Sequence, residues 1–174
     1  KSLDLSRSIM SGQQNIAFLE MGLSLKDNLQ KPTMRSVFKG ELAQLGYSVC
    51  ETLVTRFVDS FGFSQKLNKS QLETLTVDML ENFSYDSLED IVLFLKNCRQ
   101  GKYGNTHKGL DSNLIFGSWF PQYMEEKAIA REKQVEQEKS KTTQSLNNIQ
   151  AVAKTYAQIE EKKQKKKMME YVDD

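Results

Sequence analysis

Apolar residues recur every three or four positions over residues 33–62, which is the spacing of one face of an α-helix. The face consists of Phe38, Leu42, Leu45, Val49, Leu53, Phe57 and Phe61. Gly46 lies inside this range and predicts a break or a bend, whereas Gly62 is a natural stop at the carboxyl end. We therefore expect one long amphipathic helix over residues 33–62.

Helix-start signals predict a second helix that ends near Phe83. Ser70 is followed three positions later by Glu73, which fits a capping box. Asn68 is an equally good first residue, because Leu67 and Leu72 would then form a hydrophobic staple across it. Both starting points stay open at this stage.

A third helix is expected over residues 88–99. Ser87 and Asp90 repeat the capping pattern just before the apolar run at residues 91–95. Such a run is compatible with a buried strand, but the cap before it and Gly101 after it favour a central buried helix. Residues 101–110 then form the one evident long loop.

The remaining segments give weaker patterns. Residues 1–32 predict one or two short helices or an arm. Asp111 is the expected first residue of an aromatic helix, and Pro121 predicts a kink or a restart within it because proline removes a backbone donor. Residues 125–174 contain neither glycine nor proline, and we expect a long, charged, exposed helix broken near residues 140–144.

These elements predict an all-α fold. We expect a small orthogonal helical bundle over residues 33–124, preceded by an N-terminal arm over 1–32 and followed by an extended charged helical tail over 125–174. With two prolines and nine glycines among 174 residues, the chain has few obligatory breaks, which disfavours a turn-rich β fold.

Composition narrows the function classes. Lysine and arginine number 24 against 23 acidic residues, for a net charge of +1, which disfavours a polybasic nucleic-acid coat. One histidine and two distant cysteines disfavour a zinc site, and we expect Cys50 and Cys98 to be reduced core residues. No catalytic motif is visible, so we expect a non-enzymatic protein with no metal and no cofactor.

The sequence shows neither a membrane-spanning segment nor a secretion signal. The longest run of apolar residues, 91–95, is far shorter than the roughly 20 residues that span a bilayer. No secretory pattern opens the sequence. We therefore expect a cytoplasmic protein without a membrane partner.

One candidate site is the loop after the third helix, where cations surround an aromatic ring. Its candidate nucleic-acid or phosphate contacts are Lys96, Arg99, Lys102, Tyr103, His107 and Lys108. Backbone amides and cations can hold a phosphate, and a tyrosine can stack on a base. The structural alternative is a glycine cap at Gly101 followed by a solvated connection, with Tyr103 packed on the core.

Other candidate contacts lie toward the carboxyl end. Trp119 and Tyr123 are either core residues or anchors for a protein partner. Leu146, Ile149, Ala153 and Tyr156 form a thin stripe with steps of three, four and three, which is typical of a short coiled-coil seam. Leu146, Ile149 and Tyr156 are its candidate partner-binding residues. The lysine-rich segment 162–167 is either an anion contact or a solvated helix end.

Residues 67–126 carry a resemblance. Two capped helices lead to Gly101-Lys-Tyr-Gly104, then to Leu110-Asp111 and to an aromatic helix from Trp119 to Tyr123. This layout resembles a family of small uncharacterised helical proteins of Bacteroidetes bacteria, their phages and mobile elements, although Pro121 departs from the family pattern. It is similar, more distantly, to the helical domain of phage replicative-helicase loaders and inhibitors, which are non-catalytic adaptors.

Three functions follow as hypotheses. The resemblance implies an adaptor of DNA replication whose protein partner is a replicative helicase. The loop cations suggest instead a nucleic-acid-binding module. The charged tail suggests a structural or virion-associated protein that forms homo-oligomers through its C-terminal helix.

Overall fold

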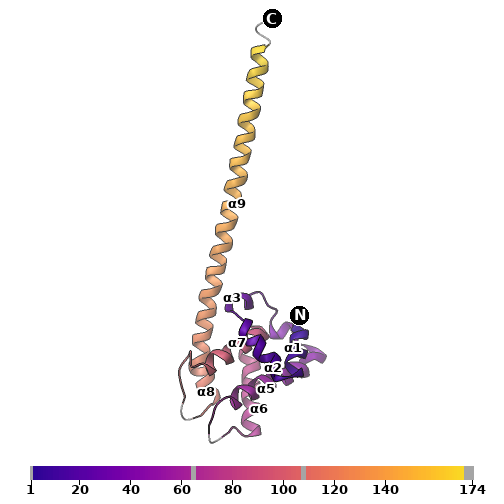
Figure 1. Ribbon diagram of the computed structural model, residues 1–174, viewed down its shortest axis with the longest axis vertical. Coiled ribbons are helices and arrows are strands. Elements are labelled where there is room, and N and C mark those ends of the chain that lie inside the picture. Colours follow the sequence, from indigo (N-terminus) through magenta and orange to yellow (C-terminus); the bar gives the residue numbers. More distant parts are fainter. Residues whose placement is uncertain (1, 64–65, 107–108, 171–174) are drawn as a thin grey trace. The chain divides into compact units, whose positions relative to one another are not determined.

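The computed structural model describes residues 2–63, 66–106 and 109–170, without the side chains of residues 2, 13–15, 145–147, 151 and 164–170. The fold is all-α, as predicted, and the described residues contain no strand (Figure 1). Its elements are α1 (Ser2–Ser11), α2 (Gln13–Gly22), α3 (Leu25–Asn28), α4 (Met34–Val37), the short 3₁₀ turn η1 (Gly40–Leu42), α5 (Ala43–Asp59), α6 (Lys69–Asn82), α7 (Leu88–Arg99), α8 (Ser112–Leu114), the π-helical turn η2 (Ile115–Trp119) and α9 (Phe120–Glu170).

The chain forms two compact units, Lys1–Arg131 and Glu132–Asp174. The first unit is the helical bundle and includes the start of α9, so the boundary follows Arg131 rather than residue 124. Residues 1–32 belong to this bundle too, because Ile9 of α1 and Ile16 of α2 are almost fully buried in its core. The predicted arm is therefore a packed part of the bundle.

The core of the first unit lies around α7. Every residue from Leu88 to Leu95 is buried. Helices α2, α3 and α5 pack against α7, and α6 packs on α5. Val49, Leu53 and Phe57 are the buried members of the stripe predicted for residues 33–62. The prediction of a buried helix over residues 88–99, in preference to a strand, is confirmed.

The predicted single helix over residues 33–62 is wrong in its first third. Thr33 caps the separate helix α4, and Gly40 adopts a left-handed φ of +59°, which interrupts the helix before α5 begins at Ala43. Phe38 lies in this interruption. Its side chain folds back against Gly46, which is buried inside α5 and neither ends nor breaks that helix.

The capping predictions are confirmed in detail. Of the two open alternatives for α6, Asn68 is the cap, and it exchanges hydrogen bonds with Gln71 in a complete capping box. Ser87 and Asp90 form the second box at the start of α7. The carboxylate of Asp111 accepts a hydrogen bond from the backbone N–H of Leu114, as expected for a cap.

The sequence predicted a kink or restart at Pro121 and a break in the carboxyl-terminal helix, and the structure has only the first of these. The expected restart takes the form of the π-helical turn η2, after which α9 begins at Phe120. The predicted break near residues 140–144 is absent, because α9 is continuous from Phe120 to Glu170 (Figure 1). Thr142 and Thr143 fit within the helix by donating to the carbonyls of Glu138 and Lys139.

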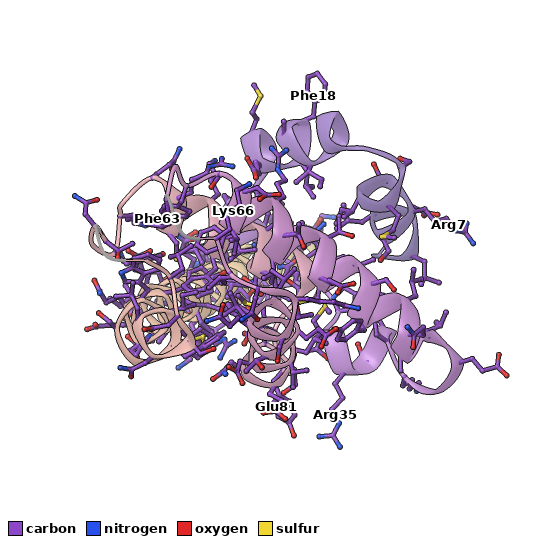
Figure 2. The ribbon with its side chains drawn as sticks, turned by 90° about the horizontal axis from the view of Figure 1, so that it is seen from below. Arg7, Phe18, Arg35, Phe63, Lys66 and Glu81 are labelled. Atoms are coloured by element: carbon purple, nitrogen blue, oxygen red, sulfur yellow. The ribbon has the colours of Figure 1, made fainter. Side chains whose placement is uncertain are left out.

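Several apolar side chains of the first unit face solvent. Phe18 and Met21 on α2 are 73% and 79% exposed, and Figure 2 shows Phe18 directed away from the rest of the bundle. Their neighbour Ile16 points inward and attaches α2 to the core. The helix is thus held by one face and leaves its apolar outer face uncovered in the described part of the chain.

We expect Gly46→Ala to lower the free energy of unfolding by about 1–2 kcal/mol, since overpacking outweighs the gain in helix propensity. A Cβ atom at Gly46 would lie 2.7 Å from the Cβ of Phe38. The measurement is the urea midpoint. Gly22→Ala is the matched control, because a Cβ there meets nothing within 4 Å. A Gly46→Ala variant as stable as the wild type would contradict the packing of Phe38 on α5.

Candidate functional site

The loop after α7 begins with a glycine cap. Gly101 has a φ of +74°, its N–H donates to the carbonyl of Cys98, and the N–H of Lys102 donates to the carbonyl of Asn97. This pair of hydrogen bonds defines a Schellman motif, in which the two amides satisfy carbonyls left open at the helix end. The structural alternative for Gly101 is confirmed.

The cations at the end of α7 are bound to α2. Lys96 Nζ donates to the backbone carbonyl of Glu20 over 2.7 Å, and Arg99 makes two hydrogen bonds to the Glu20 carboxylate, of 2.7 and 3.3 Å. Arg56 of α5 adds a third cation, with its Nε 3.6 Å from the same carboxylate. One glutamate therefore gathers three cations from two helices.

The next two residues of the candidate loop contact α9. Lys102 Nζ lies 2.6 Å from Glu126 Oε2. Tyr103 is 5% exposed, and its hydroxyl accepts from Asn97 Nδ2 and donates to Glu126. Its ring packs against Phe94 with a centroid distance of 6.0 Å.

These placements bear directly on the nucleic-acid hypothesis. A phosphate at Arg99 or Lys102 has to displace a carboxylate, and Tyr103 is too buried to stack on a base in this conformation. His107 and Lys108 lie outside the described residues. The hypothesis of a nucleic-acid interface stays a prediction, and the structure places Lys96, Arg99, Lys102 and Tyr103 in intramolecular contacts.

Trp119 and Tyr123 are core residues. They are 2% and 0% exposed, so neither presents an anchor to a partner in this fold. The ring of Tyr123 packs against Phe83 and Phe94, with centroid distances of 6.0 and 5.4 Å. This packing joins the start of α9 to α6 and α7.

Tyr123 also belongs to a buried ionic network that could not be recognised in the sequence. Lys127 of α9 is almost fully buried, with its Nζ 2.5 Å from Asp86 Oδ1 and 2.6 Å from Asp90 Oδ2. Tyr123, one turn earlier on α9, donates its hydroxyl proton to Asp90 Oδ1 over 2.6 Å. Asn28 Nδ2 of α3 donates to the same oxygen over 3.3 Å.

Asp90 is the centre of this network. The backbone N–H and the hydroxyl of Ser87 both donate to its Oδ2, so that one carboxylate caps α7 and binds α9 together. Burial alone would raise the pKa of Asp90, but the hydrogen bonds from Lys127, Tyr123 and Ser87 outweigh it and hold that pKa below its usual value. Asp90 is therefore ionised in the folded protein at neutral pH.

Asp90 completes the capping box predicted from the sequence. Asp86 and Glu89 are also buried, since each is only 6% exposed. One signal was available: Lys127 follows Tyr123 by four positions, so the two side chains share one helix face. An isolated lysine in a charged segment does not indicate burial by itself.

The second unit presents a different surface. Its described side chains are exposed from Lys139 to Lys163, including several large apolar ones. Ile149 is 63% exposed and Tyr156 is 67% exposed, and Val152 and Ile159 continue the same seam at 54% and 44%. We call these four residues the α9 stripe. The side chain of Leu146, a further candidate contact, lies outside the described residues.

Within the described part of the chain, no group of three or more histidine, cysteine, aspartate or glutamate side chains is arranged to hold a metal ion. Among the same residues, none of the helices combines the length and the apolar character needed to cross a bilayer.

Comparison with known proteins supplies no relative. No family model, no curated protein and no solved structure matches the chain. The resemblance carried by residues 67–126 thus stays a prediction.

We expect Lys127→Met to lower the free energy of unfolding by about 3–5 kcal/mol, because it leaves two buried carboxylates without their counter-ion. Lys133→Met is the matched control, since Lys133 is exposed on the same helix. Urea denaturation of both variants measures the difference. A Lys127→Met protein within about 0.5 kcal/mol of the control would show that the network contributes little to stability.

The lowered pKa of Asp90 predicts a stability loss in acid. A group with a depressed folded pKa stabilises the protein above its unfolded pKa, about 3.9 for aspartate, and that contribution is lost as the pH falls through the folded value. The urea concentration at the midpoint of unfolding should therefore decrease as the pH is lowered below about 4. This decrease should be steeper for the wild type than for Asp90→Asn. Glu136→Gln, an exposed change on α9, should keep the wild-type slope. Equal slopes for wild type and Asp90→Asn would contradict this assignment.

Proposed function

We propose that this protein is a non-enzymatic adaptor in which the bundle holds one end of α9 and the rest of α9 makes contacts with a protein partner. The observation that carries the proposal is the α9 stripe, in which Ile149, Val152, Tyr156 and Ile159 expose large apolar surface on one face of a helix. Contiguous apolar surface rimmed by polar residues is typical of a protein contact site.

The way in which α9 starts supports this role. An isolated helix is costly to nucleate in water, but the first turns of α9 are fixed by the Lys127 network and by the packing of Tyr123. A helix nucleated in this way can extend without a core of its own. The bundle then acts as a base for α9 and needs no reaction site for that role.

The resemblance to phage helicase-loader domains suggests a replicative helicase as the protein partner, in a phage or mobile element. A cytoplasmic location is part of the same proposal and is supported by Cys50 and Cys98, which are buried as free thiols. Burial raises the pKa of Cys50 to about 12, so this thiol is protonated and unreactive at neutral pH.

The test is capture of the replicative helicase encoded in the same genome by the immobilised full-length chain. We expect binding at micromolar concentration, and we expect Ile149→Glu/Tyr156→Glu to weaken it at least tenfold, since buried anchors at interfaces contribute about 2 kcal/mol or more. Ala157→Glu, on an exposed position outside the stripe, is the control. Absence of wild-type binding at micromolar concentration would contradict the helicase as the partner.

A further inference from the structure

The α9 stripe has the spacing of a coiled-coil seam. Its members follow one another by three, four and three residues, so Ile149 and Tyr156 occupy a positions and Val152 and Ile159 occupy d positions. The opposite face of the helix carries Gln150, Lys154, Ala157, Gln158 and Glu161, none of which is a large apolar residue. The stripe is therefore a single narrow seam, the shape that another helix covers.

The stripe is also complementary to itself when reversed. Its order is Ile, Val, Tyr, Ile, so an antiparallel copy sets Ile149 opposite Ile159 and Val152 opposite Tyr156. Each layer then pairs an a residue with a d residue, and the smallest side chain of the stripe meets the largest. A parallel copy would instead pair valine with valine and tyrosine with tyrosine, which fills successive layers unevenly.

The charge distribution selects the same orientation. Five lysines lie within residues 162–167, directly after the stripe. A parallel pair would set the two lysine segments side by side, and like charges repel. In the antiparallel pair, whose two-fold axis passes near Lys154, the segments lie roughly 30 Å apart at 1.5 Å of helix rise per residue, well beyond the Debye length of about 8 Å.

Small residues flank the axis of that pair. Ala153 follows Val152 and Thr155 precedes Tyr156. In the antiparallel register each of these small residues lies close to its own counterpart in the other copy. Both are small enough to let two helices approach to about 8–10 Å. A symmetric contact of this kind closes with two chains and does not propagate.

We propose that a second copy of this chain covers the α9 stripe, forming an antiparallel two-helix coiled coil centred near Lys154. The inference rests on the proposed role of the α9 stripe as the contact surface. The second copy and the helicase use the same stripe and exclude one another, so the dimer is the form of the chain without its partner. The seam is short, but α9 is already nucleated in each bundle, so pairing does not have to supply the cost of starting the helix.

The first test is the mass of the full-length chain in solution by light scattering over a range of concentrations. We expect it to approach twice the 20.0 kDa of one chain. We expect Tyr156→Glu to shift the dimer–monomer midpoint at least tenfold toward monomer. Ala157→Glu should leave the midpoint unchanged. A wild-type monomer at all concentrations overturns the inference, and if that monomer captures the helicase, the proposed function stands without it.

The second test fixes the orientation by disulfide formation. Under a mild oxidant, a mixture of Val152→Cys and Tyr156→Cys chains should form a cross-linked pair, whereas either variant alone should not. Cys50 and Cys98 are buried and do not compete for the new thiols. Rapid cross-linking of Val152→Cys alone would show a parallel seam and overturn the antiparallel arrangement.

Discussion

The Lys127–Asp86–Asp90 interaction is the constraint on which the bundle end of α9 depends. A buried lysine without counter-ions would be unstable, and two buried aspartates without a cation would be equally so. The ions therefore stabilise one another only when α9 and the start of α7 are in register. Asp90 also completes the capping box of α7 and accepts a hydrogen bond from Tyr123, so the same carboxylate contributes to the start of α7 and to the attachment of α9.

A common principle explains which parts of the fold the sequence predicted. Caps such as Asn68, Ser87 and Asp111 accept hydrogen bonds from amides within three residues of themselves, so they can be recognised from the local sequence alone. The misassigned helix over residues 33–62 failed for the opposite reason. Its apolar spacing continued through Phe38, but the left-handed Gly40 and the packing of Phe38 on Gly46 are set by the tertiary fold.

The candidate site shows the same difference between features set by local sequence and features set by the tertiary fold. The exposed seam on α9 was partly visible, since Ile149 and Tyr156 carry helical spacing in a polar segment. The partners of the loop cations were not, because Glu20 is nearly 80 residues from Arg99 along the chain. Local sequence shows that a cation exists, and only the folded chain shows whether another part of the same molecule already neutralises it.

The neutralisation of these cations depends on α2 remaining attached to the rest of the bundle. Arg56, Lys96 and Arg99 all have their acidic or carbonyl partner in one residue of α2. A chain cut by a protease after α2 and released from that helix would present three uncompensated cations on α5 and α7. Glu20 thus acts as a built-in counter-ion for Arg56 and Arg99, and a fragment lacking it would differ from the whole protein in its affinity for anions and not only in its length.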